Sequence, residues 1–90
     1  MRILVIEDDA ETAGYLVGGL EEEGHAVSRS GNGRNGLFLA MTENFDRLIV
    51  DRMLPELDGL TLVKTLRASR IETPVLFLTT MSGSMIGWWD

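Results

Sequence analysis

Two groups of acidic residues stand at the ends of apolar stretches in this 90-residue chain. Glu7, Asp8 and Asp9 follow one apolar run, and Asp51 ends a second. Open α/β sheets place ligands at the carboxyl ends of their strands, so two neighbouring parallel strands would bring these carboxylates together. Such a cluster could hold a hard divalent cation and leave one carboxylate free to react. The turn-forming residues Pro55, Asp58 and Gly59 come just after Asp51 and strengthen this interpretation.

The acidic groups can meet only if their strands lie side by side, and the apolar pattern predicts such a sheet. Strand-like runs alternate with helix-like runs, which is typical of right-handed βαβ units. Asp9 suits the N-cap of the first helix, and Gly24 suits its C-terminal end. The second helix should end near Glu43, and the third should cover about residues 58–68. We expect strands at residues 2–7, 26–29, 46–51 and 74–79, followed by a tail without regular pattern.

Composition limits the class of protein. Ninety residues suit one small domain of marginal stability. The balance of 14 acidic against 8 basic residues argues against direct nucleic-acid binding, because that requires a basic face. The absence of cysteine excludes disulfides and thiolate metal sites. No run of about 18 apolar residues and no leader-like start are present, so we expect a cytoplasmic protein with no membrane association.

The chain resembles the receiver domain of bacterial two-component response regulators, and more narrowly that of OmpR/PhoB-type winged-helix transcription factors. Three segments carry the resemblance: MRILVIEDD at residues 1–9, LIVDRMLPELDG at 48–59 and TPVLFLT at 73–79. The resemblance covers roughly residues 1–82. It implies a flavodoxin-like (CheY-like) α/β fold, a doubly wound parallel sheet of strand order 2-1-3-4. Relative to that fold the chain should be incomplete, without the fifth strand and the last helices.

The resemblance also implies roles for single residues. A sensor histidine kinase would pass a phosphoryl group to Asp51, and the hydroxyl of Thr79 would sense the phosphate. The implied Mg²⁺ ligands are Glu7, Asp8, Asp51 and the backbone carbonyl of Met53. Asp9 is better explained as a helix cap. The lysine of the family's later Lys-Pro pair has no counterpart in this chain, and Thr80 stands where a small residue is usual.

The last eight residues, Gly-Ser-Met-Ile-Gly-Trp-Trp-Asp at 83–90, depart from the family. Related receivers tend to read Gly-Ile-Asp-Asp-Arg-Val-x-Gly at this point. Codons can be chosen for that family sequence such that deletion of one base makes them encode residues 83–90 as observed. We therefore expect a truncated receiver domain at residues 1–82 and a non-family, frameshifted tail at residues 83–90. Sequencing the encoding DNA tests this, because one added base should restore the family's reading.

The expected function is that of a truncated receiver, which is a signalling domain and not an enzyme. Promoter binding is not expected of this chain, even if its parent protein binds DNA. A Mg²⁺-dependent phosphohydrolase is disfavoured, because Met53 stands where such enzymes commonly place a second carboxylate. A further alternative is a non-signalling association module. We expect a two-fold homodimer, formed through an unpaired apolar edge of the strand at 74–79 and through Trp88 and Trp89.

Overall fold

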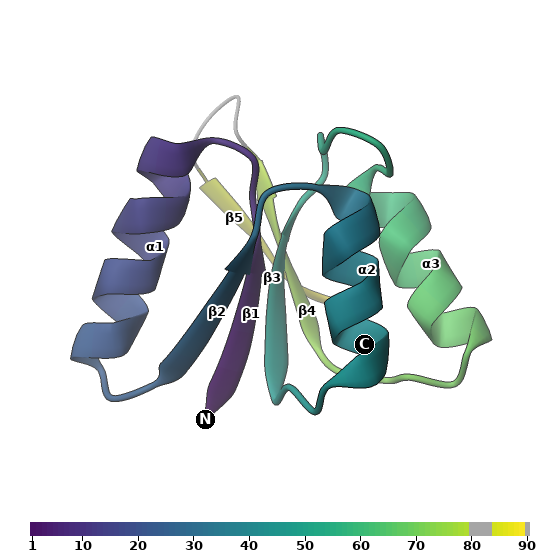
Figure 1. The fold of residues 1–90 in the computed structure, drawn as a ribbon, viewed down its shortest axis with the longest axis horizontal. Helices are drawn as coiled ribbons and strands as arrows, with labels where there is room; N and C mark the ends of the chain where they lie inside the picture. The colour runs from purple at the N-terminus through teal and green to yellow at the C-terminus, as the bar shows by residue number, and fades with distance from the viewer. Residues whose placement is uncertain (80–83, 90) are drawn as a thin grey trace.

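A single sheet forms the centre of the molecule (Figure 1). The computed structural model describes the backbone of residues 1–79 and 84–89, and side chains through residue 78. In chain order the elements are β1 (Arg2–Ile6), α1 (Ala10–Glu22), β2 (Ala26–Ser30), α2 (Gly33–Thr42), β3 (Arg47–Asp51), α3 (Gly59–Ala68), β4 (Val75–Thr79) and β5 (Ser84–Trp89). The strand order is β2-β1-β3-β4-β5. The four strands β1 to β4 are parallel, which confirms the predicted order 2-1-3-4 and the α/β class.

Each helix begins at a side-chain cap just after a turn from the carboxyl end of a strand. The carboxylate or amide oxygen of the cap accepts a hydrogen bond from the backbone N–H three residues later, which satisfies a donor that the helix leaves free. The caps are Asp9 for α1, Asn32 for α2 and Asp58 for α3. All three helices therefore start at the edge of the sheet where the acidic residues lie. Within the described ranges, no helix combines the length and apolar character of a membrane span.

The helices cover the two faces of the sheet unequally. Figure 1 shows α1 on one face, and α2 and α3 on the other. Alternation along the strands divides the apolar side chains between these layers. Leu4, Ile6, Leu48 and Val50 are buried with side chains of α2 and α3. Ile3, Val5, Ile49 and Leu78 are buried on the other face, where α1 supplies Leu16, Val17 and Leu20.

The prediction of an irregular tail is wrong for the backbone of Ser84–Trp89. These residues form β5, which pairs antiparallel with β4, so that Leu76 faces Trp88 across the ladder. The outer edge of β4 is therefore occupied, and the predicted unpaired edge is not present. The physical reason is that an edge strand carries unsatisfied N–H and C=O groups, which a chain folding back on itself can pair. Residues 80–83 and 90 lie outside the described residues.

Candidate acidic metal site

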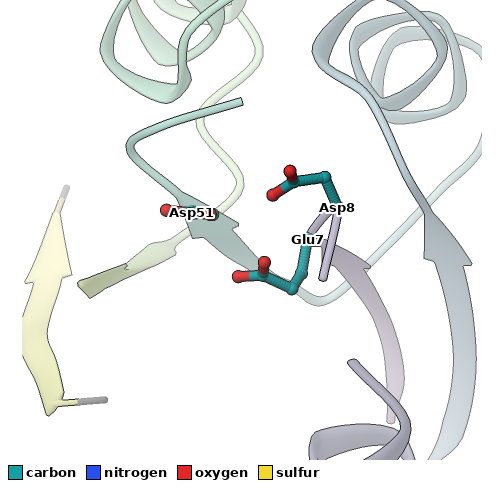
Figure 2. A group of neighbouring side chains, drawn as sticks. All are labelled: Glu7, Asp8 and Asp51. Carbon is teal, nitrogen blue, oxygen red and sulfur yellow. The ribbon is translucent and has the colours of Figure 1, made fainter. Parts of the chain in front are cut away.

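Three carboxylates meet at the carboxyl edge of the sheet. β1 and β3 are neighbours with Ile6 paired to Val50, so the next residue of each chain segment, Glu7 and Asp51, emerges at the same level. One carboxylate oxygen from each of Glu7, Asp8 and Asp51 lies within 4.8 Å of the others. Figure 2 shows the three side chains gathered at the ends of these two strands. The structure thus brings together the three acidic residues that the sequence singled out.

Two of these carboxylates are buried, and each has one oxygen that accepts no hydrogen bond from any residue the structure describes. Glu7 is 0% exposed and Asp51 is 1% exposed, whereas Asp8 is exposed. The Met53 N–H donates to Asp51 Oδ1 at 3.0 Å, and the Asp9 N–H donates to Glu7 Oε1 at 2.9 Å. Glu7 Oε2 and Asp51 Oδ2 are buried and accept no hydrogen bond from the described residues. Because buried polar atoms are normally paired, these two oxygens indicate a position for a ligand.

Burial also changes the protonation of the two carboxyl groups. Loss of solvent around Glu7 raises its pKa to about 7, and the charge of Asp51 contributes in the same direction. Burial raises the pKa of Asp51 as well, although the hydrogen bond from the Met53 N–H opposes this change. Like charges in low dielectric disfavour the ionised forms. The pair therefore needs a shared proton or a cation to be stable near neutral pH.

The sequence also singled out Asp9, Met53 and Thr79 at this edge of the sheet. Asp9 accepts hydrogen bonds from the Thr12 hydroxyl and N–H, which lower its pKa and make it the cap of α1, as expected. Met53 contributes its N–H to Asp51, and the ligand role of its carbonyl stays a prediction. Register pairs Asp51 with Leu78, so the backbone of Thr79 follows at the same edge. The hydroxyl of Thr79 and the whole of Thr80 lie outside the described atoms.

Sequence reasoning missed Arg29, and it identified Gly59 only as part of a turn and not as a residue packed against Asp51. Arg29 of β2 donates from one Nη atom to the backbone carbonyls of Glu7 at 2.9 Å and Asp8 at 3.3 Å. Gly59 begins α3 where an added Cβ would collide with the backbone carbonyl of Asp51. The sequence contains only part of the information needed to predict these two contacts. An arginine in a strand predicts no particular contact, and the Asp58–Gly59 pair predicts a turn without showing that the turn packs on Asp51.

Comparisons with known proteins agree with this geometry. The family model described as "Response regulator receiver domain" matches residues 3–86. Among curated relatives, the transcriptional regulatory protein CusR of Escherichia coli K12 is 42% identical over 81 residues, which are 90% of this chain and 36% of that protein. The transcriptional regulatory protein PcoR of Escherichia coli is 49% identical over 78 residues, which are 87% of this chain and 34% of that protein. The chain thus spans about a third of the length of these relatives.

Solved structures give the same result for the fold. The receiver domain of the Francisella response regulator 1452 superposes with a TM-score of 0.86 at 36% identity, covering 92% of this chain and 69% of that chain. The response regulator TrrA of Thermotoga maritima, solved in complex with Mg²⁺-BeF, gives a TM-score of 0.82 at 29% identity, covering 87% and 68%. Fold, acidic edge and sequence similarity thus lead to one conclusion: this chain belongs to the response regulator receiver domain family, with relatives of the OmpR/PhoB type.

Proposed function

We propose that this chain accepts a phosphoryl group on Asp51 from a sensor histidine kinase, as part of a two-component phosphorelay. The observation that carries the proposal is a pair of buried oxygens on Glu7 and Asp51, which have no hydrogen-bond partner in the described part of the chain and are grouped with the carboxylate of Asp8. A nucleophilic oxygen beside cation ligands is what phosphoryl transfer to a carboxylate requires. The names of the relatives, which are transcriptional regulators, support the same role.

The donor set fits Mg²⁺. Its oxygens are hard ligands, and two of them are buried without a hydrogen-bond partner among the described residues. Burial raises the pKa values of Glu7 and Asp51, which is the direction expected of a site that favours added positive charge. Asp8 is the best candidate for direct coordination, while Glu7 would act through a water molecule. Asp51 and the carbonyl of Met53 would complete the protein ligands. Bound Mg²⁺ would neutralise negative charge on the phosphoryl oxygens. The related TrrA structure, a complex with Mg²⁺-BeF, supports this assignment.

The residues of the chain would divide the work of transfer. The N–H of Met53 donates to Asp51 Oδ1 and so fixes the orientation of the carboxylate that attacks phosphorus. A bond forms from one carboxylate oxygen of Asp51 to phosphorus as the bond from phosphorus to the donor imidazole nitrogen breaks, and the leaving imidazole takes a proton from water. The hydroxyl of Thr79 would then contact the new phosphoryl group and report its presence. The protein mainly positions charge for this step.

The test is phosphorylation by a small phosphodonor, followed by intact-mass measurement. With Mg²⁺ present, the chain should gain the mass of one phosphoryl group, and Asp51→Asn should gain none. Asp46→Asn is a matched control, because Asp46 is exposed at the opposite end of β3. Transfer should be slow, because the single lysine of the sequence is Lys64 on α3 and the lysine of the family's later Lys-Pro pair has no counterpart. A phosphoryl group that persists in Asp51→Asn would contradict the assignment.

A second candidate is the non-signalling association module, in which the chain forms a homodimer and the acidic site is vestigial. One observation favours it: a hollow of about 410 Å³ lies open on the α1 face, lined by Met1, Ile3, Leu20, His25, Arg47, Ile49 and Leu76. No phosphorylation at all, together with a stable dimer, would favour this candidate over the receiver. In either case, DNA binding and a cytoplasmic location are proposals for a longer parent protein, because this chain spans about a third of the length of its relatives.

A further inference from the structure

The loop that carries Glu7 and Asp8 lies beyond the last paired residue of β1. The β1–β2 ladder ends with Ile6 opposite Ser30, and the last backbone bond joins the Glu7 N–H to the Ser30 carbonyl at 3.0 Å. From there to the start of α1 at Ala10, the chain makes no further backbone hydrogen bond to a strand within the described residues. The side chains that bind this segment therefore decide where its two carboxylates point.

Arg29 supplies the contact that crosses to this loop from the neighbouring strand. Its Cα lies level with Val5, so the long side chain extends forward past the end of the ladder. One Nη atom donates to the carbonyls of Glu7 and Asp8, at 2.9 Å and 3.3 Å. A guanidinium nitrogen carries two N–H groups in a fixed plane, so it can hold two successive carbonyls in one orientation. The segment held in this way carries the Glu7 and Asp8 carboxylates, which are grouped with that of Asp51 (Figure 2).

We propose that Arg29 is a positioning residue for the acidic site, which orients the Glu7–Asp8 backbone so that these carboxylates meet Asp51. The inference rests on the proposed function, because it concerns the same cation site. Arg29 would contact neither the cation nor the phosphoryl group. It acts through the backbone of two ligands, in the way that residues behind metal ligands commonly fix ligand orientation.

Arg29 has two possible effects on cation affinity, and they have opposite signs. As a positive charge near the acidic loop, where it also helps to lower the pKa of Asp9, it should repel a cation. As a clamp on two carbonyls, it should raise affinity by holding the ligands in place before binding. Removal of the side chain therefore separates the two effects. We infer that the clamp dominates, because the guanidinium is bonded to both ligand residues.

The experiment is a Mg²⁺ titration of the full chain by calorimetry or by NMR at fixed ionic strength. Arg29→Met should weaken Mg²⁺ binding by about tenfold, the lower end of the effect seen for groups that orient metal ligands. Arg29→Lys should recover part of the loss, because an ammonium keeps the charge and can still donate. Arg34→Met is the control: this exposed residue of α2 donates no hydrogen bond to the acidic loop within the described structure, and its loss removes the same charge. The Mg²⁺ affinity of Arg34→Met should be equal to that of the unmodified chain or slightly higher.

Hydrogen exchange of the Asp8 and Asp9 amides in the metal-free protein gives a readout that does not depend on cation binding. Arg29→Met should speed this exchange, while amides of α3 stay unchanged. Unchanged or increased Mg²⁺ affinity in Arg29→Met would overturn the proposal; if that variant does not fold, the same outcomes in Arg29→Gln decide. Failure of the unmodified chain to bind Mg²⁺ would instead contradict the proposed function, while faster exchange in the variant would still support the clamp.

Discussion

The acidic site shows how burial and local hydrogen bonds separate residues of the same chemical type. Glu7 and Asp51 are buried with raised pKa values, while Asp9 is exposed, caps α1 and has a lowered pKa. Four carboxylates within two short segments thus serve two purposes. The sequence could identify the acidic group and assign Asp9 to the cap, because capping residues have a known spacing. It could not show that Glu7 and Asp51 each have one buried oxygen without a partner among the described residues, because this depends on how the loops pack.

Substitutions of Asp8 and Asp9 should affect Mg²⁺ binding differently. Asp8→Ala removes a carboxylate of the three-residue cluster, and we expect Mg²⁺ affinity to fall by at least about tenfold. Asp9→Ala removes a helix cap and should instead lower the free energy of unfolding by about 1 kcal/mol. Calorimetric titration and urea unfolding of both variants measure the two quantities. Equal losses of Mg²⁺ affinity would show that Asp8 has no special role.

The raised pKa of Glu7 predicts how stability depends on pH in the metal-free protein. Its folded-state pKa of about 7 exceeds the ordinary value of 4.5, so the folded state holds a proton that the unfolded state has released between these values. This stabilisation is complete below pH 4.5 and is lost as pH rises toward 7, at up to about 1.4 kcal/mol per pH unit. The raised pKa of Asp51 should act in the same direction.

Urea unfolding in a chelator, at several pH values across this window, measures the slope. Glu7→Gln should reduce the slope, because an amide does not titrate. Saturating Mg²⁺ should do the same, because it stabilises the ionised carboxylates. A free energy of unfolding that increases with pH over this range in the metal-free chain would contradict the assignment.

At the level of elements, the strands and helices followed from the apolar pattern, while their close contacts did not. The alternation of strands and helices predicted a parallel sheet, and the resemblance to receivers implied its order 2-1-3-4. The tail failed as a prediction because Ser84–Trp89 has no alternating pattern that marks a strand, and its pairing depends on the free edge of β4. The origin of residues 83–90 as a frameshifted, non-family tail stays a prediction, which DNA sequencing tests. The family model matches the chain through residue 86.

Two glycines test whether the loop after β3 is held by close packing. Gly33 begins α2, its N–H donates to the Pro55 carbonyl at 3.1 Å, and an added Cβ would collide with the Leu57 carbonyl. Gly33→Ala should therefore lower the free energy of unfolding by about 1–3 kcal/mol. Gly14→Ala in α1 is the matched control, because a Cβ there meets nothing within 4 Å, and it should stabilise the protein by up to about 1 kcal/mol. Urea unfolding of both variants tests this, and equal effects would show that Gly33 is not tightly packed.

At the scale of the whole molecule, the uneven covering of the sheet has a consequence for assembly. One face carries α2 and α3. On the other face α1 is the only helix of the described residues, and the hollow at Ile3, Ile49 and Leu76 is open. β5 closes the outer edge of β4, so association by strand pairing at that edge is not expected. Burial of the hollow against a second copy would remove apolar surface from water, which favours a two-fold homodimer.

We expect this dimer to tighten as salt concentration rises. Each copy has a net charge of −6, so two copies repel each other, and salt screens the repulsion while the apolar contact persists. Sedimentation at micromolar concentration, in low and high salt, measures the effect. Leu76→Gln should weaken the dimer, because Leu76 lines the hollow and is only partly buried in one copy. Tyr15→Gln is the control, since Tyr15 is 84% exposed on α1 and does not line the hollow. A monodisperse monomer at every salt concentration would contradict the expected dimer and show that the hollow on the α1 face does not drive association.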